Sequence, residues 1–133
     1  MHTTNYVDTL ILPSPDSKAE QASTPERPGS VAAQQFARLV AAPFGMTSDD
    51  LLFDVHAERN GVGESDREAA RAAYFSKGQA CLRASPLVKT MGWALHHAGH
   101  GRVGLVDPAS AEFEALMARD DVTKLAGMRS KRG

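Results

Sequence analysis

The residue types best suited to bind a ligand or to carry out a reaction are concentrated in one stretch of the chain. That stretch reads Lys77-Gly78-Gln79-Ala80-Cys81-Leu82-Arg83-Ala84-Ser85. If residues 80–84 form a short strand, Cys81, Arg83 and Ser85 project from the same face, because side chains alternate along a strand. A guanidinium offers a planar fork to a carboxylate or phosphate, and a nearby hydroxyl and ammonium add donors. The stretch therefore predicts a face that binds anions.

Two further residues shortly after this stretch extend the predicted site. Trp93 either packs in the core or forms the floor of a pocket with Arg83 and Ser85 at its rim. The predicted ligand-binding residues are therefore Lys77, Arg83, Ser85, Trp93 and His96. The alternative for Arg83 is an internal ion pair with Asp49, Asp50 or Asp54, which would join two elements and leave no site.

Cys81 is the only cysteine in the sequence and the one candidate for a catalytic nucleophile. Such a thiol needs a lowered pKa and a positioned base, for which His56, His96, His97 and His100 are the candidates. Most single intracellular cysteines pack as small hydrophobic residues instead. A cysteine-dependent enzyme is thus an alternative, and the leading expectation is a protein without a catalytic residue.

The segment His96-His97-Ala98-Gly99-His100 raises the question of a metal site. Adjacent strand residues point to opposite faces, so His96 and His97 do not suit one ion. His97 and His100 could meet across a loop, but a tetrahedral site needs more ligands than this pair supplies. We expect a solvated hairpin tip, with neither a metal ion nor a cofactor.

The charge balance argues against a protein dominated by nucleic-acid or membrane binding. The chain has 15 basic and 16 acidic residues, a formal net charge of −1. The one basic cluster is the tail at residues 128–133, which we expect to be frayed. Nucleic-acid binding through that tail is a second alternative. The N-terminus lacks the pattern of a signal peptide, no apolar run suits a membrane span, and the cytoplasm is the expected compartment.

The helices and strands that must position these residues are predicted from the spacing of apolar residues and from the positions of Gly, Pro and capping residues. In chain order we expect a strand over 4–12, a Pro-rich loop over 14–29, a helix over 30–42, a strand over 51–58, a helix over 65–76 with a capping box from Ser65 to Glu68, a strand over 80–84, a turn or single helical turn at Ser85-Pro86, a hairpin of 93–97 and 102–106, a helix starting at Asp107-Pro108, and a short helix from 120 or 121 through 125. The alternative for residues 51–58 is a short helix capped by the segment Thr47-Ser48-Asp49-Asp50. The pattern predicts one α+β domain over residues 1–133, with a small antiparallel or mixed sheet and helices packed on one face.

Several segments, taken in order, resemble a family of small bacterial and fungal proteins that is known as a domain of unknown function. They are Thr47-Ser48-Asp49-Asp50-Leu51-Leu52-Phe53, Phe75-Ser76-Lys77-Gly78-Gln79, Cys81-Leu82-Arg83-Ala84-Ser85-Pro86-Leu87, Gly92-Trp93 with His96, and Met128-Arg129-Ser130-Lys131-Arg132. The resemblance covers nearly the whole chain and implies no activity. From the residues themselves we expect a non-catalytic module that binds an anionic small molecule or an acidic segment of a partner through the region Lys77–His96.

Overall fold

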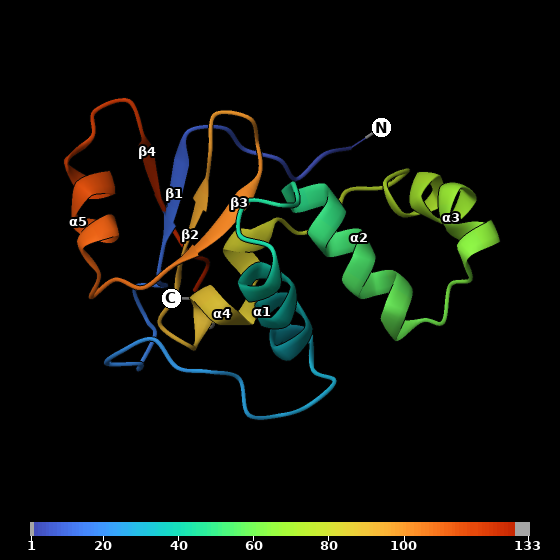
Figure 1. The fold of residues 1–133 in the computed structure, drawn as a ribbon, viewed down its shortest axis with the longest axis horizontal. Helices are drawn as coiled ribbons and strands as arrows, with labels where there is room; N and C mark the ends of the chain where they lie inside the picture. The colour runs from blue at the N-terminus through green and yellow to red at the C-terminus, as the bar shows by residue number, and fades with distance from the viewer. Residues whose placement is uncertain (1, 130–133) are drawn as a thin grey trace.

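The computed structural model describes residues 2–129, and its centre is a four-stranded mixed sheet (Figure 1). The strands are β1 (Thr9–Leu12), β2 (Ala94–His97), β3 (Val103–Val106) and β4 (Thr123–Ala126), in the order β3-β2-β1-β4. Strand β1 runs antiparallel to β2 and parallel to β4. The helices are α1 (Val31–Ala41), α2 (Ser48–Arg59), α3 (Arg67–Tyr74), α4 (Pro86–Lys89) and α5 (Ala111–Ala118), with short 3-10 turns η1 (Glu64–Asp66) and η2 (Leu82–Ala84). The predicted α+β class with a small mixed sheet is confirmed.

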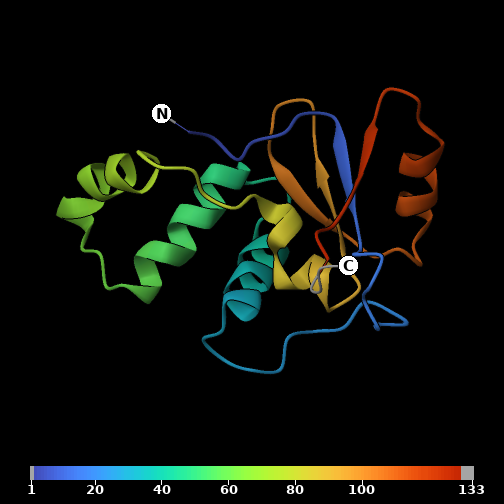
Figure 2. The ribbon, with the colours of Figure 1, turned by 180° about the vertical axis from the view of Figure 1, so that it is seen from behind.

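Each face of the sheet contributes to its own hydrophobic cluster. On one face Ile11, Leu95 and Val103 pack with residues of α1, α2 and α4, among them Leu39, Leu51 and Leu87. On the other face Leu10, Ala94 and Val106 pack with Leu116 of α5 and with Val122. Figures 1 and 2 show α5 on the far side of the strands from α1 and α4. Helix α5 thus adds a second helical layer to the one that the sequence pattern predicts.

Three elements form where the local sequence predicts them. Ser30 caps α1 by accepting a hydrogen bond from the backbone N–H of Ala33, as predicted. Ser85 caps the single turn of α4, with Pro86 at its first position. The hairpin of β2 and β3 also forms, with Ala98 N–H donating to the carbonyl of Arg102. For these three elements the stabilising contacts are local, and the predictions are confirmed.

The predicted strand over residues 51–58 is wrong, because this segment is the middle of α2. Leu51 belongs to the sheet-facing cluster, and Val55, one helical turn later, is also buried. Phe53 and Ala57, also one turn apart, pack with the residues of α3 and its end. A helix that is buried along two opposite stripes produces an apolar residue at every second position, which imitates the pattern of a strand.

The last predicted helix is also wrong, since residues 123–126 form β4 at the edge of the sheet. Its residues pair with β1 in parallel register, from Thr9 with Thr123 to Leu12 with Ala126. The backbone of β1 needs partners on both sides, and long-range pairing with β4 satisfies it. Tertiary pairing therefore overrides the local helical preference.

Two other boundaries and one cap differ from the predictions. Strand β1 begins at Thr9 and not at Thr4, since Asp8 has a positive φ of 47° and interrupts the extended run. Helix α3 begins at Arg67 and has no side-chain cap, so the predicted capping box at Ser65 is wrong. The capping box forms instead at Thr47 and Asp50, at the start of α2.

The Pro-rich loop over residues 14–29 lies across the surface and is anchored at several points. The backbone N–H groups of Ser14 and Ser23 donate to the carbonyls of Val88 and Met91. The close approach near Met91 requires Gly92, because a Cβ atom there would lie 2.7 Å from the carbonyl oxygen of Gln21. The loop thereby connects β1 to α1 across the helical layer.

Candidate functional site

The predicted strand over residues 80–84 is wrong, and with it the shared face of Cys81, Arg83 and Ser85. The chain makes the turn η2 instead, in which Leu82 points into the core and is fully buried. Arg83 Nε donates to the carbonyl of Ala126 over 2.7 Å, and the carbonyl of Arg83 accepts from the N–H of Met128. The guanidinium therefore joins η2 to the end of β4, and the ion pair weighed for it does not form among the described residues.

Trp93 and His96 lie apart from the other predicted residues. Trp93 Nε1 donates to the carbonyl of Ser23 over 2.8 Å, which fastens the Pro-rich loop, and its ring contacts Phe36. His96 lies on the opposite face of the sheet from the α1 and α4 layer, with its ring edge-to-face against Phe44. Burial lowers the pKa of His96. The structure thus does not bring the five predicted residues into one pocket.

Lys77 and Ser85 do border neighbouring hollows, which meet at Tyr74. The hollows have volumes of about 600, 200 and 210 Å³, and Tyr74 lines all of them. We call this surface the Tyr74 groove and define it by Gln35, Leu52, His56, Tyr74, Lys77 and Ser85. Its walls come from α1, α2, α3 and the segment from Lys77 to Pro86, which crosses behind α2 in Figure 1 and in front of it in Figure 2.

Aromatic packing holds Tyr74 at the centre of the groove. Its ring centroid lies 4.5 Å from that of His56 and 5.9 Å from that of Phe53. Burial, followed by the charge of Asp49, raises the pKa of Tyr74. The phenol is therefore a neutral group at neutral pH and can act as a hydrogen-bond donor or acceptor.

Gln35 and Ser85 form a buried polar pair on the inner wall of the groove. Gln35 is 2% exposed and Ser85 4% exposed. The Ser85 hydroxyl donates to Gln35 Oε1 over 2.6 Å and accepts from the N–H of Leu87. Within residues 2–129, no protein acceptor binds Gln35 Nε2, and this nitrogen keeps some contact with solvent, since it is not one of the fully buried unpaired atoms. Gln35 lines two of the hollows, so this donor can bind a ligand there.

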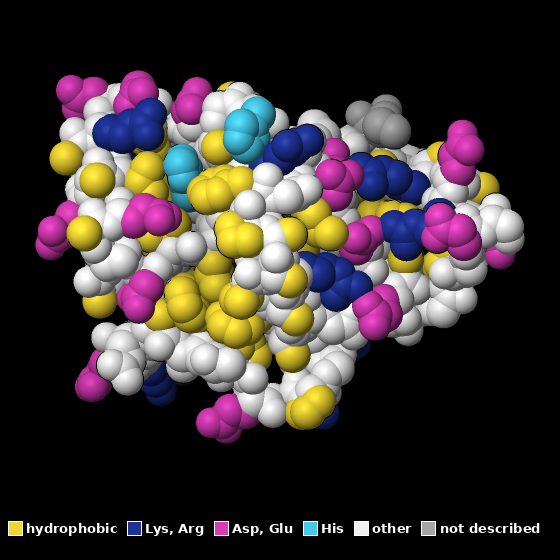
Figure 3. Space-filling view, viewed as in Figure 1, with side chains coloured by type: hydrophobic (Ala, Val, Ile, Leu, Met, Phe, Trp, Pro, Cys, Tyr) yellow, Lys and Arg dark blue, Asp and Glu magenta, His cyan; other side chains and the backbone are white. Residues whose placement is uncertain are grey.

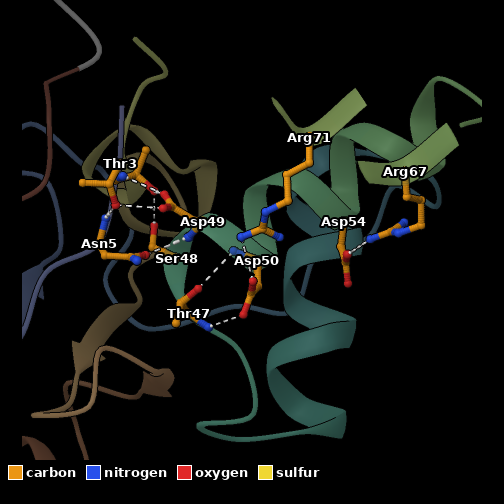
Figure 4. Close-up of polar contacts among 10 residues, drawn as sticks. Thr3, Asn5, Thr47, Ser48, Asp49, Asp50, Asp54, Arg67 and Arg71 are labelled. Atoms are coloured by element: carbon orange, nitrogen blue, oxygen red, sulfur yellow. Dashed lines mark hydrogen bonds and ion pairs between the residues drawn. The ribbon is translucent and has the colours of Figure 1, made fainter. Parts of the chain in front are cut away.

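Three arginines of α1 and α3 pair with acidic residues of α2. Arg71 pairs with Asp50 at 2.9 Å, Arg67 pairs with Asp54, and Arg38 pairs with Glu58. Figure 4 shows the first two pairs bridging α3 to α2, and Figure 3 shows basic and acidic side chains alternating over these helices. These three ion pairs therefore join α1 and α3 to α2.

The cations that border the groove differ from those arginines. Lys77 lines the hollow of about 600 Å³, and Arg59 lines the hollow of about 200 Å³ together with Gln35. Arg59 Nη1 donates to the carbonyl of Gly29 over 2.8 Å. Neither side chain forms an ion pair with any residue that the structure describes. The groove therefore has positive charge that no protein carboxylate cancels.

Asp49, which the sequence reading considered only as a partner for Arg83, anchors the N-terminal segment. Its carboxylate accepts hydrogen bonds from Thr3 Oγ1, from the N–H of Thr4 and from Thr4 Oγ1, each at 2.7 Å (Figure 4). Asn5 Oδ1 accepts in turn from the N–H of Asp49. The start of α2 is thus a folding contact with residues 3–5 and not an open ligand site.

Cys81 lines the same hollow as Gln35 and Ser85. Its sulfur lies 3.3 Å from the hydroxyl of Tyr6, and this contact is the main cause that raises the pKa of Tyr6. No histidine in the described part of the chain is hydrogen-bonded to the thiol. The geometry gives the cysteine a phenol neighbour and no general base.

His97 is the buried ionisable residue whose environment sequence reasoning missed. It is fully buried, and both ring nitrogens have no hydrogen-bond partner among residues 2–129. Its ring lies edge-to-face on Tyr6, and burial lowers its pKa to about 4. Alternation along β2 places it opposite His96, as predicted, but the predicted solvated hairpin tip is wrong for His97, which lies in the interior.

Two further features of the described residues concern metal binding and membrane insertion. No group of three or more His, Cys, Asp or Glu side chains in residues 2–129 is placed to hold a metal ion. None of the helices in this range combines the length and the hydrophobicity that crossing a bilayer demands. Of the predicted basic tail, Met128 and Arg129 are described, and residues 130–133 lie outside the described residues.

Comparison with known proteins identifies a family but not an activity. The model of a family of unknown function (DUF6157) matches residues 1–133, and the chain therefore belongs to that family. Neither the curated proteins nor the solved structures give a significant match.

Proposed function

We propose that the protein is a non-catalytic binding module that holds an anionic small molecule in the Tyr74 groove. The observation that supports this most directly is the contrast between two sets of cations. Arg38, Arg67 and Arg71 pair with acidic residues of α2, whereas Lys77 and Arg59 border the groove without a carboxylate partner in residues 2–129. Cations that stay unpaired beside a concave, partly apolar surface favour binding of a negative ligand.

The proposed site differs from the set of ligand-binding residues that the sequence predicts. Lys77 and Ser85 stay in it, while Arg83, Trp93 and His96 have structural partners elsewhere. An acidic segment of a partner protein is the other occupant that these cations would suit. A cytoplasmic location, and a family drawn from bacteria and fungi, remain predictions from the sequence.

A thermal-shift screen of carboxylated and phosphorylated metabolites tests the proposal. We expect a hit that raises the melting temperature of the wild-type protein and whose affinity falls about tenfold, or roughly 1.4 kcal/mol, in Lys77→Met or Arg59→Gln. Lys18→Met is the matched control, because Lys18 is exposed on the Pro-rich loop and lines none of the three hollows.

Two results would count against a small-molecule site. The first is a screen without any hit, and the second is a hit whose affinity is the same in wild type, Lys77→Met and Arg59→Gln. Binding of an acidic peptide, with no small molecule binding in the same groove, would replace the small molecule by a partner segment.

A further inference from the structure

We infer that the ligand of the Tyr74 groove is a small carboxylic acid with an apolar body, whose carboxylate is bound by the side-chain amide of Gln35 and the guanidinium of Arg59. This inference rests on the proposed function and deepens it by naming the ligand class. The ligand's carboxylate would bind in the hollow of about 200 Å³ that both residues line.

The amide of Gln35 is oriented by its neighbour. The Ser85 oxygen already accepts the N–H of Leu87, and its single hydrogen is donated to Gln35 Oε1. This pairing turns the oxygen of the amide toward Ser85 and directs Nε2 away from it. Because Gln35 lines the hollow and its Nε2 has no acceptor within residues 2–129, an acceptor atom of a ligand that enters the hollow can bind this nitrogen in place of water.

Arg59 supplies the charge for that acceptor. It lines the same hollow, and one of its N–H groups is used by the carbonyl of Gly29. The rest of its guanidinium makes no contact with a carboxylate in the described chain. A planar guanidinium and a planar amide together match a planar carboxylate, which accepts from both.

The remaining walls select the rest of the ligand. Val31, Leu52, Val55 and the Tyr74 ring offer apolar contact in this hollow, which His56 and Asn60 also line. A phosphate carries more charge into these surroundings than one arginine offsets, and desolvating it is correspondingly costly. The hollow therefore favours a monocarboxylate with an apolar chain or ring over a phosphorylated compound.

The experiment compares four ligands of similar shape by NMR titration of the wild-type protein: phenylacetate, phenylacetamide, 2-phenylethanol and phenyl phosphate. We expect phenylacetate to bind at least about tenfold more tightly than each of the others. We also expect the side-chain NH₂ signals of Gln35 to shift and to exchange more slowly with water, since the ligand accepts their hydrogen.

Variants then test the two residues individually. Gln35→Glu keeps an acceptor for Ser85 but replaces the donor by a negative oxygen, and Arg59→Gln removes the charge. Each should weaken phenylacetate binding about tenfold. Arg38→Gln is the matched control, because Arg38 pairs with Glu58, and it should leave the affinity unchanged. If Gln35→Glu does not fold, the Gln35 signals of the wild-type protein decide in its place.

The outcomes separate this inference from the proposed function. Equal binding of phenylacetamide, tighter binding of phenyl phosphate, or phenylacetate binding that leaves the Gln35 signals unmoved overturns the carboxylate assignment. If other anions still bind in a manner that depends on Lys77, the proposed function stands without it. If no anion binds the wild-type protein, both fail.

Discussion

The hydroxyl of Ser85 donates to the side-chain oxygen of Gln35 across 50 residues of sequence, at a distance of 2.6 Å. This bond joins α1 to the start of α4 inside the core. The same hydroxyl caps α4, so one oxygen stabilises a helix and orients an amide. The pair connects the stability of the fold to the candidate site.

Ser85→Ala should therefore cost more than the loss of an ordinary cap. The change leaves the buried Gln35 oxygen and the Leu87 N–H without their partner, and we expect a loss of about 2–3 kcal/mol in the free energy of unfolding. Urea denaturation measures it. Thr90→Ala is the control, because the exposed Thr90 hydroxyl donates only to a carbonyl of its own turn. Equal losses in both variants would contradict the linking role.

His97 predicts a specific dependence of stability on pH. Its pKa is about 4 in the folded protein against an ordinary 6.5, so the unfolded chain binds the proton more tightly. Stability from this residue is fully present above about pH 6.5 and falls as the pH drops toward about 4, by on the order of 3 kcal/mol. Urea denaturation of wild type and His97→Leu across this range measures the difference.

The variant should lose this part of the pH dependence, since leucine cannot be protonated. His100→Gln is the control, because His100 is exposed at the hairpin loop. Parallel curves of stability against pH for wild type and His97→Leu would show that the buried ring does not carry the effect.

The docking of α3 on α2 should depend on Phe53 more than on the ion pairs. The guanidinium carbons of Arg67 and Arg71 lie 5.1 and 5.8 Å from the centroid of the Phe53 ring, which is itself 1% exposed. Phe53→Ala should cost about 3–5 kcal/mol, whereas Asp54→Asn should cost less than about 1 kcal/mol because the pair is partly exposed. Chemical denaturation of the two variants ranks them, and the reverse order would assign the docking to charge.

Asp49→Asn should release the N-terminal segment. The substitution replaces one acceptor oxygen by an NH₂ group that faces the donors of Thr3 and Thr4. We expect a loss of about 1–3 kcal/mol and faster hydrogen exchange at the N–H of Thr4. Asp120→Asn, at an exposed position after α5, should change neither. Unchanged exchange at Thr4 in Asp49→Asn would mean that other contacts hold the segment.

The element predictions that the structure confirms rest mostly on interactions between residues close together in the sequence. Ser30 before an apolar stripe, Ser85 before Pro86, and a hairpin with a glycine-containing loop are signals that act within a few residues. Each leads to the element that it predicts. The class of the fold follows from these elements, because an interleaved set of short strands and helices must build a sheet covered by helices.

Two of the wrongly predicted segments have neighbours on more than one side. Residues 51–58 alternate because α2 packs against the sheet layer through Leu51 and against α3 through Phe53. Residues 123–126 form a strand because they pair in parallel with β1. Neither neighbour can be read from the segment itself.

The sequence by itself determined the α+β class, the hairpin, the caps of α1 and α4, and the concentration of polar groups after α3. Only the tertiary structure decided which of those groups face one hollow. Arg83 is occupied by a carbonyl of β4, while Gln35 and Arg59, which no local motif singles out, meet at the Tyr74 groove. The reason is physical: a binding surface depends on which donors the rest of the chain leaves unpaired, and that is settled by contacts between residues distant in sequence.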